Sequence, residues 1–145
     1  MKKVVISKNT ETTALLAELF FNKELSRRSE RAVVVALEGD LGSGKTTFVQ
    51  ALARFMGVDV TVSSPTFVIQ KTYDAKKVFK KIFHIDAYRL KTGSDLLLLR
   101  FEETIKDPDN LVLIEWPEIV RGVLPKDTKT ITFRFVSHNE REVAF

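Results

Sequence analysis

The chain lacks cysteine and has few of several other residues, with four prolines, six glycines, two methionines and one tryptophan among 145 residues. The absence of cysteine excludes disulfide bonds, thiolate metal ligands and a cysteine nucleophile. It also suits a reducing compartment, so we expect a cytoplasmic protein. No apolar run approaches the roughly 20 residues of a membrane-spanning helix. The N-terminal segment MKKVVISKN has only three apolar residues in a row, too few for the core of a signal peptide. We therefore expect no membrane partner.

The composition is that of an ordinary globular protein, with 44% hydrophobic and 29% charged residues. There are no repeats, no low-complexity tracts and no linker rich in proline, glycine or serine. A chain of this length can bury a real hydrophobic core, and we expect one domain spanning 1–145. Eleven phenylalanines are many for this length, and we expect most of them in that core.

The formal charge is +4 and the pI is about 9.4, a balance that has two interpretations. A basic protein often binds nucleic acid. Alternatively, the excess of lysine and arginine belongs to a solvated surface and a phosphate site. The basic residues are scattered, and no aromatic RNA-binding signature is present. We favour the second interpretation and expect no DNA partner.

The most informative segment is 39–46, GDLGSGKT, which fits the phosphate-loop pattern G-x-x-x-x-G-K-[ST]. The run AVVVAL at 32–37 is apolar and β-branched, as expected of a strand buried on both faces. After the loop, Phe48, Leu52 and Phe55 recur at helical spacing. Strand, loop and helix therefore follow in the order that a nucleotide-binding loop requires.

The residue types of this loop explain how it would hold a phosphate. Glycines at 39, 42 and 44 allow backbone conformations that turn successive N–H groups toward an anion. The helix that begins near Lys45 adds free N–H groups and the positive end of its dipole. Lys45 would reach the β- and γ-phosphates, and the Thr46 hydroxyl would bind Mg²⁺. We expect ATP or ADP with Mg²⁺ here, bound by Asp40, Leu41, Gly42, Ser43, Gly44, Lys45, Thr46 and Thr47.

The rest of the chain predicts an α/β fold like that of phosphate-loop NTPases, with a mixed sheet flanked by helices. Buried strands alternate with helices early, and hairpins follow later. Expected strands are 4–6, 66–73, 78–88, 111–114, 128–136 and 141–145, and further helices are 10 to about 28 and 95 to about 106. Sites in such sheets gather at the carboxyl ends of the strands.

Two carboxylates are expected at that edge. Glu115 follows the apolar strand 111–114, where a Mg²⁺ ligand usually stands. Asp86 could orient an attacking water or complete the metal shell, and alternation predicts that His84 and Tyr88 share its face of the strand. For Glu115 the alternative is a solvent-facing carboxylate, and for His84 it is a hydrogen-bonded, half-buried imidazole without a role in the chemistry.

The segment Ser63-Ser64-Pro65-Thr66 is where a nucleotide-sensing loop could lie, with hydroxyls on Ser64 and Thr66. The alternative is a plain Ser-Pro turn. Arg89 could stabilise transition-state charge if it lay near the γ-phosphate, but the sequence does not place it there.

The motifs GDLGSGKTTF, SSPTF, HIDAYRL and IEWPE, in this order, resemble the TsaE family of tRNA threonylcarbamoyladenosine biosynthesis proteins. The resemblance covers most of the chain and is thinnest at both ends. It implies a small single-domain ATPase with an unusual mixed sheet. It also implies a role in making threonylcarbamoyladenosine in tRNA, without transferring the threonylcarbamoyl group itself. The implied partner is a TsaB–TsaD heterodimer that ATP binding and hydrolysis reset between turnovers, so that tRNA is an indirect partner.

The same resemblance assigns roles to individual residues. It places Lys45 on the phosphates and Thr46 and Glu115 on Mg²⁺, and it makes Asp86 important for hydrolysis. It implies that Trp116 lies next to the metal site and that Arg141 corresponds to a basic residue near the nucleotide. Lys45, Asp86 and Glu115 are thus the expected catalytic residues, and Thr66 joins the nucleotide-binding set.

One departure from the family concerns Arg100, which stands where the family often has glycine. This departure affects the expected loop geometry and not the chemistry.

Two other functions share some of these features. A small-molecule or nucleoside kinase has the same loop and size, but it usually carries an arginine-rich lid, and 89–100 has no arginine cluster. An RNA-binding module that uses the nucleotide only structurally is supported by the basic charge alone.

Overall fold

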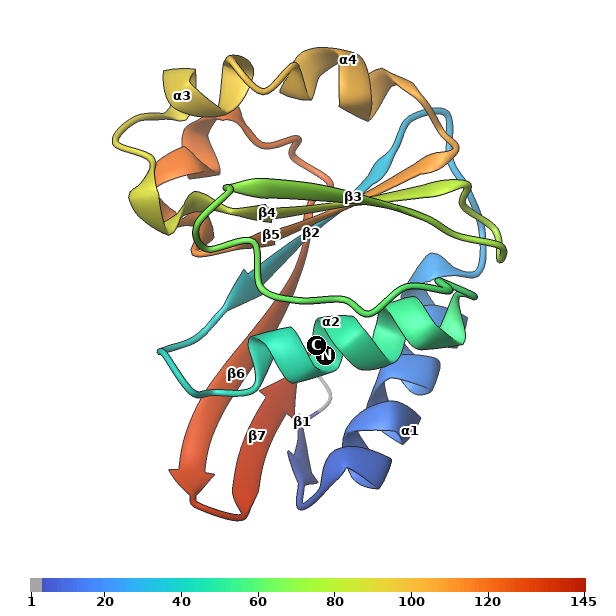
Figure 1. Cartoon of the computed structure of the whole chain (residues 1–145), viewed down its shortest axis with the longest axis vertical. Coiled ribbons are helices and arrows are strands. Elements are labelled where there is room, and N and C mark those ends of the chain that lie inside the picture. The colour runs from blue at the N-terminus through green and yellow to red at the C-terminus, as the bar shows by residue number, and fades with distance from the viewer. Residues whose placement is uncertain (1–3) are drawn as a thin grey trace.

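The computed structural model describes residues 4–145, so the first three residues of the expected domain and of the N-terminal segment lie outside it. Seven strands form one mixed sheet in the order β1-β7-β6-β2-β5-β4-β3, with helices on both faces (Figure 1). The strands are β1 Val4–Ser7, β2 Val33–Glu38, β3 Gln70–Asp74, β4 Lys81–Asp86, β5 Asn110–Glu115, β6 Lys129–Ser137 and β7 Glu140–Ala144. The helices are α1 Thr10–Phe20, α2 Lys45–Phe55, α3 Gly93–Leu97 and α4 Phe101–Lys106, with helical turns η1 Phe21–Leu25, η2 Ala87–Arg89 and η3 Pro117–Val123.

The middle of the sheet is parallel and its edges are antiparallel. Strands β6, β2, β5 and β4 run in one direction, whereas β7 and β3 run against their neighbours. Strand β1 is antiparallel to β7, so it has the same sense as β2. The carboxyl ends of β1, β2, β4, β5 and β6 therefore meet at one edge, which confirms the expected mixed sheet.

Each face of the sheet has its own apolar core. Helices α1 and α2 cover one face, where Phe20 packs edge-on against Phe48 and Phe145 at ring-centroid distances of 5.9 and 5.2 Å (Figure 1). Helices α3 and α4 cover the other face over a cluster that includes Leu96 and Phe101. Most phenylalanines are buried, as the sequence predicts, whereas Phe67 and Phe135 are exposed.

Several elements are shorter than expected. The predicted helix 10–28 begins at its Asn9 cap, but the α-helical part ends at Phe20 and one π-helical turn continues to Leu25. The predicted strand 66–73 begins only at Gln70, because the segment before it folds into a turn on the Pro65 carbonyl. Strand β4 ends at Asp86 and turns into η2, since the Asp86 side chain caps the Tyr88 N–H. The prediction that Tyr88 lies on the strand with His84 was therefore wrong.

The predicted helix 95–106 is broken at Arg100. This residue has φ 61° and ψ 35°, a left-handed conformation that separates α3 from α4. Glycine adopts this conformation without a steric cost. Arginine therefore keeps the loop geometry that glycine would give, at the expense of backbone strain. No helix within residues 4–145 is long and apolar enough to span a bilayer.

We expect Arg100→Gly to stabilise the protein by up to about 1 kcal/mol. Relief of the left-handed strain is worth about 1–2 kcal/mol for a residue with a Cβ, and the greater freedom of glycine in the unfolded chain offsets about 0.4–1 kcal/mol. The ion pair to Glu103, at 3.9 Å between two exposed side chains, contributes little. Denaturant titration measures the change.

The matched control is Leu98→Gly, two residues earlier. Leu98 is 83% exposed and has a right-handed φ of −66°, so glycine there should destabilise the protein by about 0.5–1 kcal/mol. A similar loss for both variants would show that Arg100 carries no strain.

Candidate functional site

The loop between β2 and α2 has the backbone shape of a phosphate cradle. Gly39, Gly42 and Gly44 have φ of 153°, 78° and 101°. A Cβ on Gly39 would lie 2.5 Å from the Phe133 carbonyl oxygen, so only glycine fits against β6. Gly44 is the left-handed residue that precedes α2, so the free N–H groups of the first helical turn face the loop. This geometry matches the sequence prediction of an anion-binding turn.

Lys45 is folded inward at the start of α2, although lysine is rarely buried. It is 5% exposed, its Nζ donates to the Gly39 carbonyl, and the same nitrogen lies 3.7 Å from the centroid of the Trp116 ring. Burial lowers the pKa of the Lys45 ammonium, and the nearby carboxylates of Glu115 and Asp86 act against this shift. The ammonium is thus held beside the loop by a carbonyl, a ring face and negative charge.

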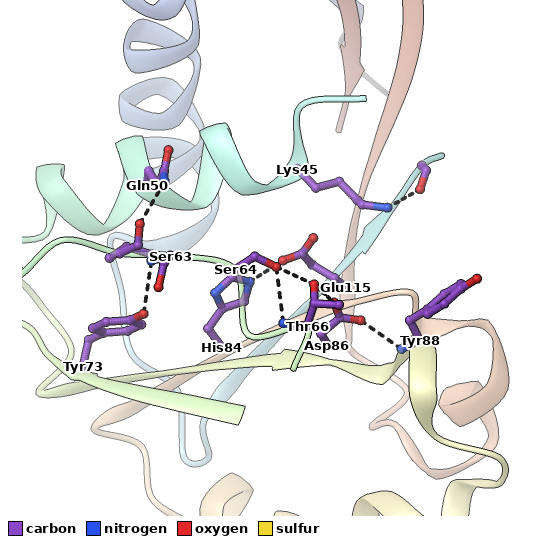
Figure 2. Close-up of polar contacts among 12 residues, drawn as sticks. Lys45, Gln50, Ser63, Ser64, Thr66, Tyr73, His84, Asp86, Tyr88 and Glu115 are labelled. Atoms are coloured by element: carbon purple, nitrogen blue, oxygen red, sulfur yellow. Dashed lines mark hydrogen bonds and ion pairs between the residues drawn. The ribbon is translucent and has the colours of Figure 1, made fainter. Parts of the chain in front are cut away.

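Glu115 ends β5 and is 3% exposed, so its carboxylate is buried and does not face open solvent. His84, which is fully buried, places its Nε2 2.5 Å from the Glu115 Oε2. Figure 2 shows both side chains on the side of the sheet that faces the start of α2. The alternative of a solvent-facing glutamate is therefore wrong, whereas His84 is hydrogen-bonded, as its alternative expected, but fully buried instead of half-buried.

Asp86 stands next to Glu115, because the two residues are direct partners in the parallel pairing of β4 with β5. It is 4% exposed, and its Oδ2 accepts a 2.9 Å hydrogen bond from the Thr66 hydroxyl (Figure 2). The Ser64 hydroxyl lies 2.6 Å from the same Thr66 oxygen. The predicted nucleotide-sensing segment 63–66 is thus hydrogen-bonded to Asp86, one of the two predicted carboxylates.

Trp116 follows Glu115 in a left-handed conformation, with φ 55° and ψ 58°. In this conformation the Trp116 ring contacts the Lys45 ammonium, and its centroid lies 5.2 Å from that of the Tyr88 ring. Trp116 therefore lies beside the predicted metal ligand Glu115, and it also contacts the predicted phosphate ligand Lys45.

Arg141 reaches the loop from β7. Its Nε donates a 2.9 Å hydrogen bond to the Gly42 carbonyl, and its Nη1 donates to carbonyls of the β6–β7 turn, including that of Glu140 at 3.0 Å. Arg89 lies elsewhere, with its guanidinium 5.0 Å from the ring of the exposed Phe67, and it does not line the pocket described below. The structure thus brings Arg141 to the site and leaves Arg89 outside it.

A pocket of about 420 Å³ joins these groups. Its lining includes every predicted nucleotide, metal and catalytic residue except Asp40, which is exposed on the loop and accepts a backbone hydrogen bond from Ser43. The predicted members that line it are Leu41, Gly42, Ser43, Gly44, Lys45, Thr46, Thr47, Thr66, Asp86 and Glu115.

A second wall of this pocket was not predicted from the sequence. It consists of Ser7 at the end of β1, the following Lys8 and Asn9, Thr10 and Thr13 in the first turn of α1, and His138 and Asn139 from the β6–β7 turn. These residues reach the site because β1 has the same sense as β2 and pairs with β7. The sequence predicts a helix that begins near residue 10, but it does not show that the start of this helix lies beside the phosphate loop.

The donor set of the pocket fits a magnesium nucleotide. The loop offers backbone N–H groups and an ammonium for phosphates, while Thr46 and Glu115 offer the oxygen ligands that Mg²⁺ prefers. Within residues 4–145, no three His, Asp or Glu side chains gather closely enough to hold a metal by themselves. That is expected of Mg²⁺, which takes few ligands from the protein and the others from substrate phosphates and water.

Comparisons with known proteins identify the family of this chain. The family described as Threonylcarbamoyl adenosine biosynthesis protein TsaE matches residues 7–143. A TsaE from Rickettsia felis is 34% identical over 139 residues, covering 95% of this chain and 76% of the relative. A TsaE from Borreliella burgdorferi is 38% identical over 104 residues, covering 71% of this chain and 74% of the relative.

A solved structure shows the same fold. The crystal structure of YdiB from Bacillus subtilis is similar with a TM-score of 0.74 and 28% identity, covering all of this chain and 84% of the other. Sequence and fold thus agree over nearly the whole length, and the chain belongs to the TsaE family of threonylcarbamoyl adenosine biosynthesis proteins.

Proposed function

We propose that this chain binds MgATP and hydrolyses it in support of threonylcarbamoyladenosine formation in tRNA. The observation that supports this most directly is the meeting of Lys45 with the buried pair Asp86 and Glu115 in one pocket beside the phosphate loop. Family membership supplies the pathway, because the relatives carry the name of that biosynthesis.

The binding role falls to the loop and the start of α2. Free N–H groups from Gly42 to Thr47 would hold the phosphates, and Lys45 would move its ammonium from the Gly39 carbonyl to the phosphate oxygens. Thr46 and Glu115 would hold Mg²⁺, which supplies charge neutralisation at the phosphates when bound. Because the loop already has this conformation and Lys45 already lies beside it, nucleotide binding would require little rearrangement of the protein.

Hydrolysis would depend on Asp86. Its carboxylate lies beside Glu115 at the pocket, where it could accept a proton from a water or orient that water. The Thr66 hydroxyl donates a hydrogen bond to Asp86, so a change at this carboxylate would alter the contacts of the segment 63–66. We infer that this segment reports the state of the nucleotide to the protein surface.

The partner would be a TsaB–TsaD heterodimer, as the family resemblance implies, and tRNA would be reached through that complex. In this proposal the chain does not transfer the threonylcarbamoyl group. It acts as a slow ATPase whose turnover resets the complex, and a role beside tRNA agrees with the cytoplasmic location expected from the sequence.

Lys45→Ala should weaken MgATP binding roughly 10- to 150-fold, because a hydrogen bond to a charged group contributes about 1.5–3 kcal/mol. Calorimetric titration measures the affinity. Lys126→Ala removes the same charge from an exposed position in the turn before β6 and should bind normally. Equal affinities for wild type and Lys45→Ala would remove Lys45 from the phosphate site.

Glu115→Gln should lower the affinity of the protein–ADP complex for Mg²⁺ on the order of tenfold or more, because the amide lacks the charge that attracts the cation. ADP affinity in EDTA should stay near that of wild type. Both affinities come from titrations with and without Mg²⁺. Glu102→Gln, at an exposed glutamate on α4 outside the pocket, is the control and should leave Mg²⁺ binding unchanged. If Glu115→Gln unfolds instead, the glutamate is structural.

The proposed function itself predicts slow MgATP hydrolysis by the chain alone and marked stimulation by TsaB and TsaD from the same source. Lys45→Ala should abolish the stimulated rate. Fast hydrolysis without partners would contradict the switch role. Phosphate appearing on a small molecule from a metabolite pool, with no stimulation, would indicate the kinase instead.

A further inference from the structure

The buried imidazole of His84 lies beside the site and has no task in the proposed function. It lies on β4, is fully buried, and does not line the pocket. Its Nε2 lies 2.5 Å from the Glu115 Oε2, a short contact of the kind made between a ring nitrogen and a carboxylate. Figure 2 shows His84 pointing toward Glu115 from the neighbouring strand.

The register of the sheet explains why these side chains meet. His84 is paired with Leu113, and Asp86 is paired with Glu115, in the parallel ladder of β4 and β5. His84 precedes Asp86 by two positions along β4, so it lies on the same face of the sheet and is the diagonal neighbour of Glu115. Glu115 lines the pocket and His84 stands behind it, so the histidine can reach a nucleotide or metal only through the glutamate.

The contact restricts the glutamate side chain. Glutamate loses considerable rotamer freedom when it is held in one orientation, and here the Nε2 contact fixes Oε2 toward the sheet. Oε1 is then the oxygen that remains for a cation in the pocket. A carboxylate that is already oriented does not have to be ordered when the ligand binds.

Stability alone does not account for a histidine at this position. Its second ring nitrogen, Nδ1, is buried and has no hydrogen-bond partner in the described part of the chain. Leaving a buried polar atom unpaired is unfavourable, and the apolar side chains of Ile82 and Leu113 are fully buried nearby in β4 and β5. The benefit of the imidazole therefore lies in its bond to Glu115.

We propose that His84 is a positioning residue that holds the Glu115 carboxylate in the orientation that binds the Mg²⁺ of the nucleotide complex. This inference rests on the proposed function, because it assigns Glu115 to Mg²⁺. Hydrogen-bonded partners of metal ligands commonly control metal affinity in this way.

The test compares two substitutions of the histidine. His84→Leu removes the donor, and the affinity of the protein–ADP complex for Mg²⁺ should fall about 10- to 100-fold, while ADP affinity in EDTA stays unchanged. His84→Gln places an amide N–H₂ near the position of Nε2 and should recover most of the Mg²⁺ affinity. Calorimetry with Mg²⁺ and ADP measures both effects without any turnover. Wild-type Mg²⁺ affinity in His84→Leu would overturn the proposal.

A double-mutant cycle separates positioning from simple destabilisation. If His84 acts through Glu115, His84→Leu should have no further effect on Mg²⁺ affinity in the Glu115→Gln background. Additive losses would overturn the proposal. Should His84→Leu fail to fold, His84→Gln and His84→Asn replace it: the shorter asparagine does not reach Oε2, so only His84→Asn should lose Mg²⁺ affinity, and equal affinities would count against positioning.

The titration of the wild-type protein distinguishes a failure of the proposed function from a failure of the role assigned to His84. If Mg²⁺ does not bind the wild-type protein–ADP complex, the proposed function fails, and the role of His84 fails with it. If Mg²⁺ binds and depends on Glu115 but not on His84, only the positioning role is wrong.

Discussion

The site depends on two buried carboxylates that stand side by side. Asp86 and Glu115 are direct partners across β4 and β5, and both are at least 95% buried. Like charges in such a position repel and lose their hydration, so each needs its own compensation. Glu115 has the His84 ring nitrogen, Asp86 has the Thr66 hydroxyl and the Tyr88 N–H, and the buried Lys45 ammonium attracts both. The carboxylates of Asp86 and Glu115 thus connect strands β4 and β5 with the segment 63–66 and with Lys45 of the phosphate loop.

This arrangement gives the segment before β3 a mechanical connection to the pocket. The segment is fastened to Asp86 twice, through the Thr66 hydroxyl at 2.9 Å and through the Ile69 carbonyl, which accepts from the Asp86 N–H at 2.8 Å. Ile69 has φ 70°, an unfavourable conformation for a β-branched residue. Phe67 and Val68, between the two attachments, are exposed at 82% and 58%. This loop is strained and exposes apolar side chains. Because the Thr66 hydroxyl donates to the Asp86 carboxylate, the loop can respond to a change at that carboxylate.

The sequence was sufficient for the parts of the molecule that local patterns control. The strand–loop–helix order around Lys45, the two acids at strand ends and the mixed sheet followed from apolar runs and glycine spacing. Elements that end through a specific contact were not predictable: β4 stops because Asp86 caps Tyr88, and the helix expected over 95–106 breaks where Arg100 turns left-handed. The second pocket wall after β1 was missed for a different reason. It depends on which strands pair, and the pairing of β1 with β7 joins the two ends of the chain.

That pairing also decides when the phosphate loop can acquire its shape. The Gly42 carbonyl accepts a hydrogen bond from Arg141, 99 residues later in the chain, and position 39 accommodates only glycine because the carbonyl of Phe133 on β6 lies so close to it. Contacts between distant residues form only after the entropy of closing the intervening chain has been lost. The local motif therefore supplies the glycines and the lysine of the proposed phosphate site, whereas the C-terminal hairpin fixes the conformation of that loop. A change in β6 or β7 that spares every residue of the motif can on this basis still weaken nucleotide binding.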